Sequence, residues 1–342
     1  MNIVRDSKLM RRAGVLAPMA ALAVLLAACG SSSNSSSTTT TGSATTAAKS
    51  SYTIAYVPGA TGVAFYTSLS NGMKAEAQAL GMKYEYQGAA QFSPSAQTPV
   101  VEGVCTQHPS VLVVSPTDPV ALAPAINTCL NEGVPVITTD TTLKDASKIT
   151  SQITTNNLQG GQLAADFIGK QIGGSGEVAV LSLSATASTQ VQRVQGFQNE
   201  LKAKFPNIKL VTVQYVGQAI SDSTTATNAI MLAHPNLKAI FSVAETGAEG
   251  AEVALQTTAA GRKVINVAFD ASPSEVKLLQ AGKLSATIAQ DPALEGKLAA
   301  QYAFDKLTGK TSSIKAQVQL NDVLITSADS NQASFSKYFY KL

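Results

Sequence analysis

The chain has 342 residues, with 25 Lys and Arg against 22 Asp and Glu, 2 His and 3 Cys. Charged residues make up 14% of it, against about 25% in average soluble proteins, so we expect no surface that follows nucleic-acid phosphates. The length allows about two domains. Two histidines are too few for most histidine-based metal sites, so we expect no bound metal.

The first 28 residues are typical of an export signal. A basic stretch ending at Arg11-Arg12 precedes the apolar run Ala13–Leu26, which is shorter than the ~20 residues that a membrane-spanning helix needs. The ending Leu26-Ala27-Ala28-Cys29 resembles the bacterial lipoprotein box, in which the cysteine is acylated. We therefore expect a signal peptide at 1–28 and an extracytoplasmic protein anchored to the cell membrane by a lipidated Cys29. The alternatives are an ordinary cleaved signal and a weak membrane anchor.

Residues 29–50 are expected to form a tether. From Gly30 to Ser50 the chain is almost wholly Ser, Thr, Gly and Ala, which bury too little apolar surface to offset the entropy of ordering. The segment is therefore predicted to be disordered and to leave the folded body near the membrane surface.

From Tyr52 onward, short apolar runs alternate with helical patterns. The expected strands are Thr53–Val57, Lys83–Tyr86, Val111–Val114, Val134–Thr138, Val178–Leu183, Lys209–Tyr215, Ala239–Val243, Val264–Ala268 and Ala286–Ala289. The expected helices include Phe65–Leu80, Leu122–Asn131, Gly161–Ile172, Gln190–Lys204, Gly247–Thr258 and Leu294–Leu307. This alternation predicts an α/β fold with two doubly wound, Rossmann-like parallel sheets covered on both faces.

Polar loops follow the carboxyl ends of the expected strands, where ligands bind in open α/β sheets. These loops contain Pro58–Tyr66, Ser115–Asp118, Asp140, Leu183–Thr189, Ala244-Glu245, Asp270 and Gln290. They hold hydroxyls, carboxylates, amides and two aromatic rings, but neither a nucleophile with its base nor a glycine-rich phosphate loop. The pattern predicts a binding protein without a cofactor, and not an enzyme.

Seven segments carry a resemblance to a known family. They are Phe65-Tyr66-Thr67-Ser68-Leu69, Val113-Val114-Ser115-Pro116-Thr117-Asp118, Gly133-Val134-Pro135-Val136-Ile137-Thr138-Thr139-Asp140, Asn156-Asn157-Leu158-Gln159-Gly160-Gly161, Ala233-His234-Pro235, Val267-Ala268-Phe269-Asp270 and Ala286-Thr287-Ile288-Ala289-Gln290. In this order and spacing they resemble the ribose-binding-protein family, the sugar-binding group of type I periplasmic binding proteins. Its members are extracytoplasmic solute-binding proteins of ABC importers.

The resemblance implies two lobes joined by a three-strand hinge. One lobe is expected at 52–155 plus 291–319, and the other at 156–290 plus 320–342. It also implies that Phe65 and Tyr66 stack on the apolar face of a sugar, while Asp140, Asp270 and Gln290 bind its hydroxyls. The alternatives are that the two aspartates only cap turns and that the two aromatic rings only pack in the core.

The chain departs from the pentose-binding pattern in several places. Val63, Ser115 and Ala244 stand where that pattern has Asn, and Thr141 replaces an Arg beside Asp140. Val191 replaces a second Arg, and Arg193 is expected to face elsewhere on its helix. Gln218 stands near the place of an aromatic residue. The remaining ligand candidates are then Ser115, Thr141, Gln218 and Glu245.

These departures predict an acidic pocket without a guanidinium group. Such a pocket disfavours anionic solutes and argues against ribose itself. A small neutral sugar or polyol fits, and an amine-bearing or signalling solute is the competing ligand class. The absence of Trp favours a small ligand.

Cys105 and Cys129 lie on the second and third helices of the first lobe. In a sheet of order 2-1-3-4, right-handed crossovers place these helices side by side, and export allows oxidation. We therefore predict a Cys105–Cys129 disulfide, with two buried free thiols as the alternative. His108 and His234, each next to a proline at a helix end, are interpreted as structural.

The sequence as a whole predicts a monomeric, lipid-anchored binding protein that captures a small solute and delivers it to an ABC permease. A sensory binding protein that reports to a membrane receptor is an alternative with the same folded body. A repressor is excluded, since a leader and tether occupy the place of a DNA-reading helix-turn-helix.

Overall fold

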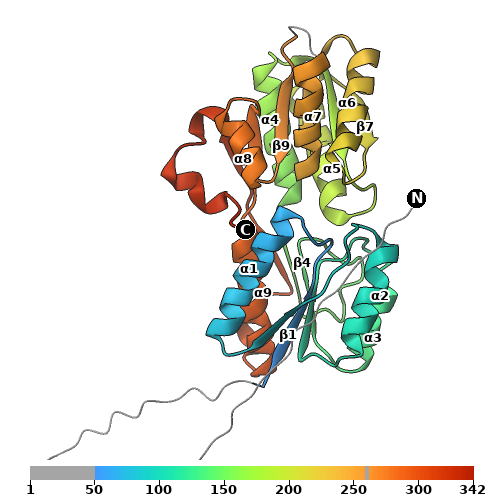
Figure 1. The fold of residues 1–342 in the computed structure, drawn as a ribbon, viewed down its shortest axis with the longest axis vertical. Coiled ribbons are helices and arrows are strands. Elements are labelled where there is room, and N and C mark those ends of the chain that lie inside the picture. The colour runs from blue at the N-terminus through green and yellow to red at the C-terminus, as the bar shows by residue number, and fades with distance from the viewer. Residues whose placement is uncertain (1–50, 259–261) are drawn as a thin grey trace, which may run out of the picture. The chain divides into compact units, whose positions relative to one another are not determined.

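The computed structural model describes residues 51–258 and 262–342 of the chain (Figure 1). The expected signal peptide, Cys29 and tether lie outside these residues. No helix in this part of the chain is both long enough and apolar enough to cross a membrane.

The first sheet has six parallel strands in the order β11-β5-β4-β3-β1-β2. They are β1 (Thr53–Val57), β2 (Lys83–Tyr86), β3 (Val111–Val114), β4 (Val136–Thr139), β5 (Ser151–Thr155) and β11 (Gln317–Leu320). Its helices are α1 (Ala64–Ala79), α2 (Pro94–Cys105), α3 (Ala123–Asn131) and α9 (Pro292–Leu307). We call this sheet and its helices the first lobe.

The second sheet repeats this order as β12-β10-β9-β8-β6-β7. Its strands are β6 (Ser175–Ser182), β7 (Asn207–Tyr215), β8 (Leu237–Ser242), β9 (Ile265–Phe269), β10 (Ala286–Ala289) and β12 (Val323–Thr326), of which β12 alone runs antiparallel to its neighbour. Its helices are α4 (Asn157–Gln171), α5 (Ser188–Lys204), α6 (Ile220–Ala233), α7 (Glu245–Thr258) and α8 (Pro273–Gln280). These elements form the second lobe.

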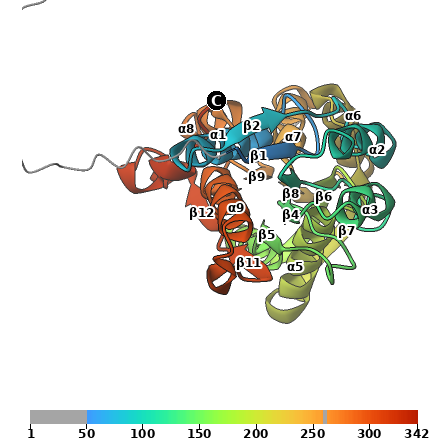
Figure 2. The same ribbon diagram turned by 90° about the horizontal axis from the view of Figure 1, so that it is seen from below.

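The chain passes between the two sheets three times, after β5, after β10 and after β11. The predicted fold class, two doubly wound α/β lobes joined by three connections, is confirmed. Two short 3₁₀ helices that follow β12, Ser327–Asp329 and Ala333–Tyr338, complete the C-terminal segment (Figure 2).

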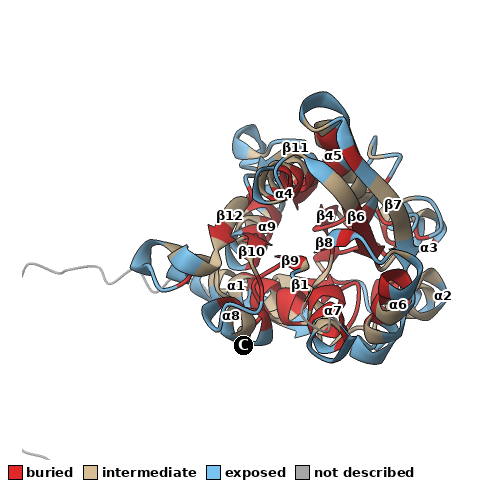
Figure 3. Cartoon of the chain, turned by 90° about the horizontal axis from the view of Figure 1, so that it is seen from above, coloured by how far each residue is buried: buried red, intermediate tan, exposed pale blue. Residues whose placement is uncertain are grey.

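Alternating side chains in the buried strands supply two cores in each lobe. In the first lobe, Ile54 and Tyr56 pack toward α1 and α9, whereas Ala55 and Val57 pack toward α2 and α3. The central strands are therefore apolar on both faces, as parallel sheets between helices require. Figure 3 shows the central strands buried and the outer faces of the helices exposed.

The elements that the sequence does not predict are polar or short. β5 reads SQITT and β11 reads QVQL, so neither carries a continuous apolar run. Helix α8 has only eight residues and is fixed by a capping box, in which the Ser272 hydroxyl and the Glu275 carboxylate each accept from the other's backbone N–H. Tertiary pairing and capping, more than hydrophobic pattern, decide these elements.

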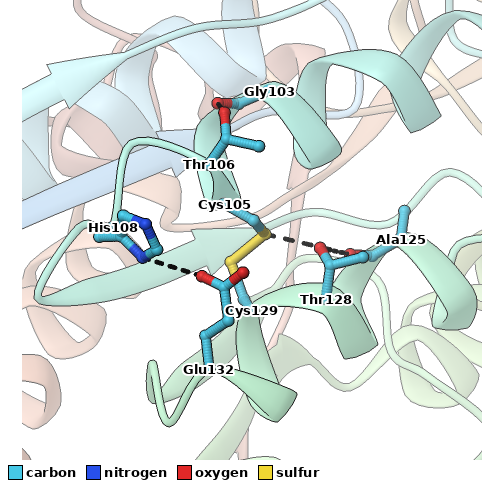
Figure 4. Close-up of a disulfide and its surroundings, with 8 residues drawn as sticks. All are labelled: Gly103, Cys105, Thr106, His108, Ala125, Thr128, Cys129 and Glu132. Carbon is cyan, nitrogen blue, oxygen red and sulfur yellow. Dashed lines mark hydrogen bonds and ion pairs between the residues drawn. A yellow bond between two sulfur atoms is a disulfide. The ribbon is translucent and has the colours of Figure 1, made fainter.

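The predicted disulfide joins Cys105 to Cys129, with the two Cα atoms 5.0 Å apart (Figure 4). It links α2 to α3, which lie side by side on one face of the first sheet as the right-handed crossovers predict. Beside it, exposed His108 pairs through Nδ1 with Glu132 Oε2 at 2.8 Å. His234 lies 3.7 Å from Glu177, so both histidines contact glutamates outside the cavity described below.

Candidate functional site

A cavity of about 240 Å³ lies at the carboxyl ends of the strands and is lined by residues of both lobes. This volume is below the roughly 300–1,000 Å³ that is usual for drug-sized ligands. Seven of the nine predicted ligand residues line it: Phe65, Tyr66, Asp140, Gln218, Glu245, Asp270 and Gln290. The structure therefore brings together side chains that are more than 200 residues apart.

Ser115 and Thr141 are not among the lining residues. The Ser115 hydroxyl is fully buried between Tyr56 OH at 3.1 Å and Thr139 Oγ1 at 2.9 Å. Thr141 is also fully buried and donates its N–H to the Thr139 carbonyl at 2.7 Å. Both side chains belong to the interior of the first lobe, so their predicted contact with a ligand finds no support in the geometry.

Asp140, directly after β4, has a φ of +60°, in the left-handed region that few residues except Gly adopt. Its N–H donates to Glu295 Oε1, and its carbonyl accepts from Thr154 Oγ1 at 2.5 Å. Its carboxylate accepts from Tyr66 OH at 2.8 Å. Burial raises the pKa of Asp140 to about 6, while Arg193 and the Tyr66 hydrogen bond oppose this rise.

Asp270, directly after β9, also has a positive φ, of +95°. Its Oδ1 accepts from Gln290 Nε2 at 2.5 Å and from Tyr340 OH at 2.7 Å. The side-chain amide oxygen of Gln290, Oε1, accepts in turn from Thr155 Oγ1 at 2.8 Å. The carboxylate and the amide that the sequence predicts as hydroxyl-binding groups are therefore neighbours with fixed orientations.

The prediction that Arg193 faces away from the site is wrong. Its side chain is 3% exposed and lines the cavity, whereas Val191 is 42% exposed on the outer side of α5. Positions 189, 190, 193, 196 and 197 share the buried face of this helix, so the arginine lies on it and Val191 does not. The expected pocket without a guanidinium group is accordingly corrected: one is present.

The guanidinium of Arg193 is fixed by contacts within the second lobe. Its Nε donates to Asn157 Oδ1 at 2.7 Å and an Nη donates to the Val243 carbonyl at 2.8 Å. The group lies over the Phe269 ring, 3.6 Å from the centroid. A buried cation with this many partners is a rigid hydrogen-bond donor beside the cavity.

Two buried acids near Arg193 escape the sequence analysis. Burial raises the pKa of Glu295, in the first turn of α9, well above its usual range, and raises that of Asp322, between β11 and β12, to about 7. Arg193 lowers both pKa values. The available signal is position in the chain: Asp322 lies in the crossing from β11 to β12, and Glu295 lies in the first turn of the helix after the β10 crossing.

Side chains of the second lobe accept hydrogen bonds from the backbone of the first at the edge of the cavity. Gln218 Oε1 accepts from Phe92 N–H at 2.8 Å, and Glu245 Oε1 accepts from Ala64 N–H at 3.4 Å. Burial raises the pKa of Glu245 to about 8, with the Asp270 charge adding to the rise. These contacts close the cavity between the lobes.

Three aromatic rings line the first-lobe side of the cavity. Phe65 and Tyr66 meet edge to face, with centroids 5.3 Å apart. Phe92, from the loop before α2, is the third ring and is not predicted from sequence. Gly59 makes room for this group, since a Cβ there would lie 2.3 Å from the Tyr66 hydroxyl oxygen.

The cavity can recognise a small polyhydroxylated molecule. Carboxylates, an amide and a guanidinium supply planar donors and acceptors for hydroxyl groups, and the rings offer apolar faces. Within 51–258 and 262–342 no three His, Cys, Asp or Glu side chains are arranged to bind a metal ion.

Comparisons with known proteins agree with this arrangement. The family model of the periplasmic binding protein domain matches residues 54–311. The ribose import binding protein of Bacillus subtilis is 32% identical over 262 residues, 77% of this chain and 84% of that protein. The D-apiose import binding protein of Actinobacillus succinogenes is 34% identical over 211 residues, 60% and 67% of the two chains. An Agrobacterium vitis ABC transporter solute-binding protein, solved with α-D-tagatopyranose, superposes with a TM-score of 0.81 at 29% identity, covering 85% of this chain and 100% of that one.

Proposed function

We propose that this chain, which belongs to the family of periplasmic binding proteins, captures a small neutral sugar or polyol outside the cytoplasm and delivers it to an ABC permease. The observation that carries the proposal is the pair of strand-end carboxylates, Asp140 from one lobe and Asp270 from the other, beside one small cavity with three aromatic rings. Each carboxylate accepts hydrogen bonds from ligand hydroxyls, and the rings pack against the C–H face of the ligand.

The relatives support a monosaccharide ligand. Those compared above are named for ribose and D-apiose, and the superposed structure contains tagatopyranose. Val63 and Ala244 line the cavity in this chain, and these apolar side chains replace amides of the pentose-binding pattern. The sugar is therefore expected to differ from ribose at the hydroxyls that those amides would bind.

Capture works by hinge closure. A ligand that contacts both lobes stabilises the closed arrangement over the open one by the difference between its affinities for the two. Asp140, Phe65 and Tyr66 act from the first lobe, and Asp270 and Arg193 act from the second. Gln290, at the β10 crossing, acts at the hinge, so the permease receives a conformation that depends on the ligand.

An amine-bearing solute is the second candidate. Glu245 favours it, because this buried carboxyl faces no cation within hydrogen-bond distance in the described part of the chain. A cationic group beside Glu245 would lower the pKa of this carboxyl and form an ion pair with its carboxylate. A sensory protein that reports the same solute to a membrane receptor differs only in its partner, and import of the solute that fails on deletion of the gene distinguishes the two.

Membrane attachment is part of the proposal. Acylation of Cys29 after removal of residues 1–28 would anchor a monomeric receptor through residues 29–50. Cys29→Ala should release the protein from the membrane fraction, and intact mass spectrometry should show a diacylglycerol group only on the parent protein.

The function is tested by mass spectrometry of small molecules that co-purify with the protein, followed by calorimetric titration of D-ribose, D-arabinose, D-allose, D-tagatose, polyols and amines. Asp140→Asn and Asp270→Asn should each raise the Kd about 100-fold, because each removes a charged acceptor of ligand hydroxyls. The control is Asp145→Asn, at an exposed position in the first lobe. If none of these compounds binds, solute capture is refuted. Equal Kd values in all three variants would refute the assigned site.

A further inference from the structure

The C-terminal segment after β12 returns to the ligand site, although it lies beyond the residues that match the family model. Tyr340 N–H donates to the Ala271 carbonyl at 3.0 Å in the second lobe. Asn71 Nδ2 of α1, in the first lobe, donates to the Lys341 carbonyl at 3.2 Å. Figure 1 shows the C-terminus beside α1 and α8.

Tyr340 contacts one lining residue from each lobe. Its hydroxyl donates to Asp270 Oδ1 at 2.7 Å, and its ring meets Phe65 edge-on, with centroids 6.0 Å apart at 69°. The side chain is 6% exposed and is not itself among the residues that line the cavity. It therefore lies behind an aromatic ring and a carboxylate that face the ligand.

The hydrogen bond from Tyr340 fixes how Asp270 is presented. Both hydrogen bonds found for this carboxylate in the described part of the chain, from Gln290 and Tyr340, go to Oδ1, so Oδ2 is left for a ligand. Burial raises the pKa of Tyr340 well above its usual value, and Asp270 adds to the rise, so the hydroxyl stays a neutral donor. Asp140 has the corresponding arrangement with Tyr66, a residue that itself lines the cavity.

We propose that Tyr340 is a positioning residue of the ligand site, which orients Asp270 and supports Phe65 from behind. A carboxylate held in one rotamer pays less entropy on binding and distinguishes hydroxyl orientations better than a free one. This inference rests on the proposed function, since it requires a ligand whose hydroxyl contacts Asp270.

The test compares Tyr340→Phe with the parent protein by calorimetric titration of D-ribose, D-arabinose, D-allose and D-tagatose. Loss of one hydrogen bond to a charged group should raise the Kd of the sugar that binds most tightly about tenfold, and the Kd values of the weaker-binding sugars less. The preference between D-ribose and D-arabinose, epimers at one carbon, should narrow by a similar factor. A purely structural role would weaken all sugars equally. Tyr338→Phe is the matched control, because Tyr338 is half-buried on the same segment under Lys337.

The thermal unfolding of both variants shows whether folding is retained, as expected since Phe keeps the ring against Phe65. Affinity and epimer preference that stay at parent values in folded Tyr340→Phe overturn the positioning role while leaving the proposed function intact. If the parent protein binds none of the four sugars, capture of these sugars is refuted, and the positioning role is refuted together with it.

Discussion

The two lobes present their carboxylates with the same backbone arrangement but in different electrostatic surroundings. Asp140 and Asp270 each follow a central strand with a positive φ, and the carbonyl of each accepts from a threonine of the next strand, Thr154 or Thr287. Each carboxylate also accepts from a tyrosine hydroxyl. Local geometry at the strand end is thus repeated, as the repeated strand order allows.

The surroundings differ because they come from distant parts of the chain. Asp140 lies near Arg193 and donates its N–H to the acid Glu295, whereas Asp270 is bonded to the uncharged Gln290 and Tyr340. Backbone topology therefore places a charged group at the site in each lobe. Side chains from other elements determine the electrostatic surroundings of that group and which of its oxygens is available. Three predictions test how the two lobes differ.

The largest effect is expected from Arg193→Gln. This change leaves Asp140, Glu295 and Asp322 buried without their nearby cation, so the free energy of unfolding at pH 8 should fall by about 3–5 kcal/mol. Because the three acids take up protons in acid, the loss should be smaller at pH 5. Urea unfolding of the ligand-free protein at both pH values measures this.

Lys204→Gln is the control for that experiment. Lys204 lies on the same helix, and its bridges to Glu200 and Asp166 are at the surface, so the free energy of unfolding should stay nearly constant. An Arg193→Gln variant that is as stable as this control at pH 8 would show that the guanidinium does not balance the acids.

The second prediction concerns corresponding helix pairs. The first lobe joins α2 to α3 through the disulfide, whereas the second packs α6 on α7 through Gly250, where a Cβ would lie 2.4 Å from the Ile220 carbonyl oxygen. Replacing both bridged cysteines by Ala should lower the free energy of unfolding by about 3 kcal/mol, since the bridge closes a loop with a separation of 24 residues. Gly250→Ala should cost about 1–3 kcal/mol through overpacking.

Reducing agent separates the two effects. It should destabilise the parent protein and Gly250→Ala, and leave the cysteine variant unchanged in urea unfolding. Titration of two thiols in the folded, unreduced parent protein would contradict the bridge.

The third prediction is a pH dependence that comes from Glu245. Its pKa is about 8 in the folded state and roughly 4.3 when unfolded, so between these values the folded state binds the extra proton. Stability from this group is therefore complete below about pH 4 and falls as pH rises toward 8, by at most about 1.4 kcal/mol per pH unit.

Glu245→Gln should remove this contribution and flatten the dependence. The measurement is urea unfolding of the ligand-free protein between pH 5 and pH 8, with Glu102→Gln as an exposed control outside the cavity. A slope that matches that of the parent protein would show that Glu245 already titrates normally in the folded state.

Much of the site follows from local sequence. Asp140 and Asp270 each follow an apolar strand, and polar residues at that point of a parallel sheet lie at its ligand-binding edge. The disulfide follows from strand order as well, because right-handed crossovers place the helices of Cys105 and Cys129 side by side. Arg193 could not be placed in this way. On α5 the side chains two positions apart, Val191 and Arg193, face solvent and cavity respectively, and only the packing of the helix fixes its rotation about its axis.

Phe92, Glu295 and Tyr340 are not predicted from the sequence as parts of the site. None follows a predicted strand, and each reaches the site through packing of a loop, a helix start or the C-terminal segment. Ser115 is the converse case, because it follows a strand yet is enclosed by Tyr56 and Thr139.

The sequence by itself determined the two-lobed α/β fold, the family and the acidic residues at the strand ends, because period, order and strand-end position are properties of the chain alone. The tertiary structure decided which charges meet and which oxygens stay available, because energies between buried groups depend on distances and exclusion of water that arise only when remote segments pack together.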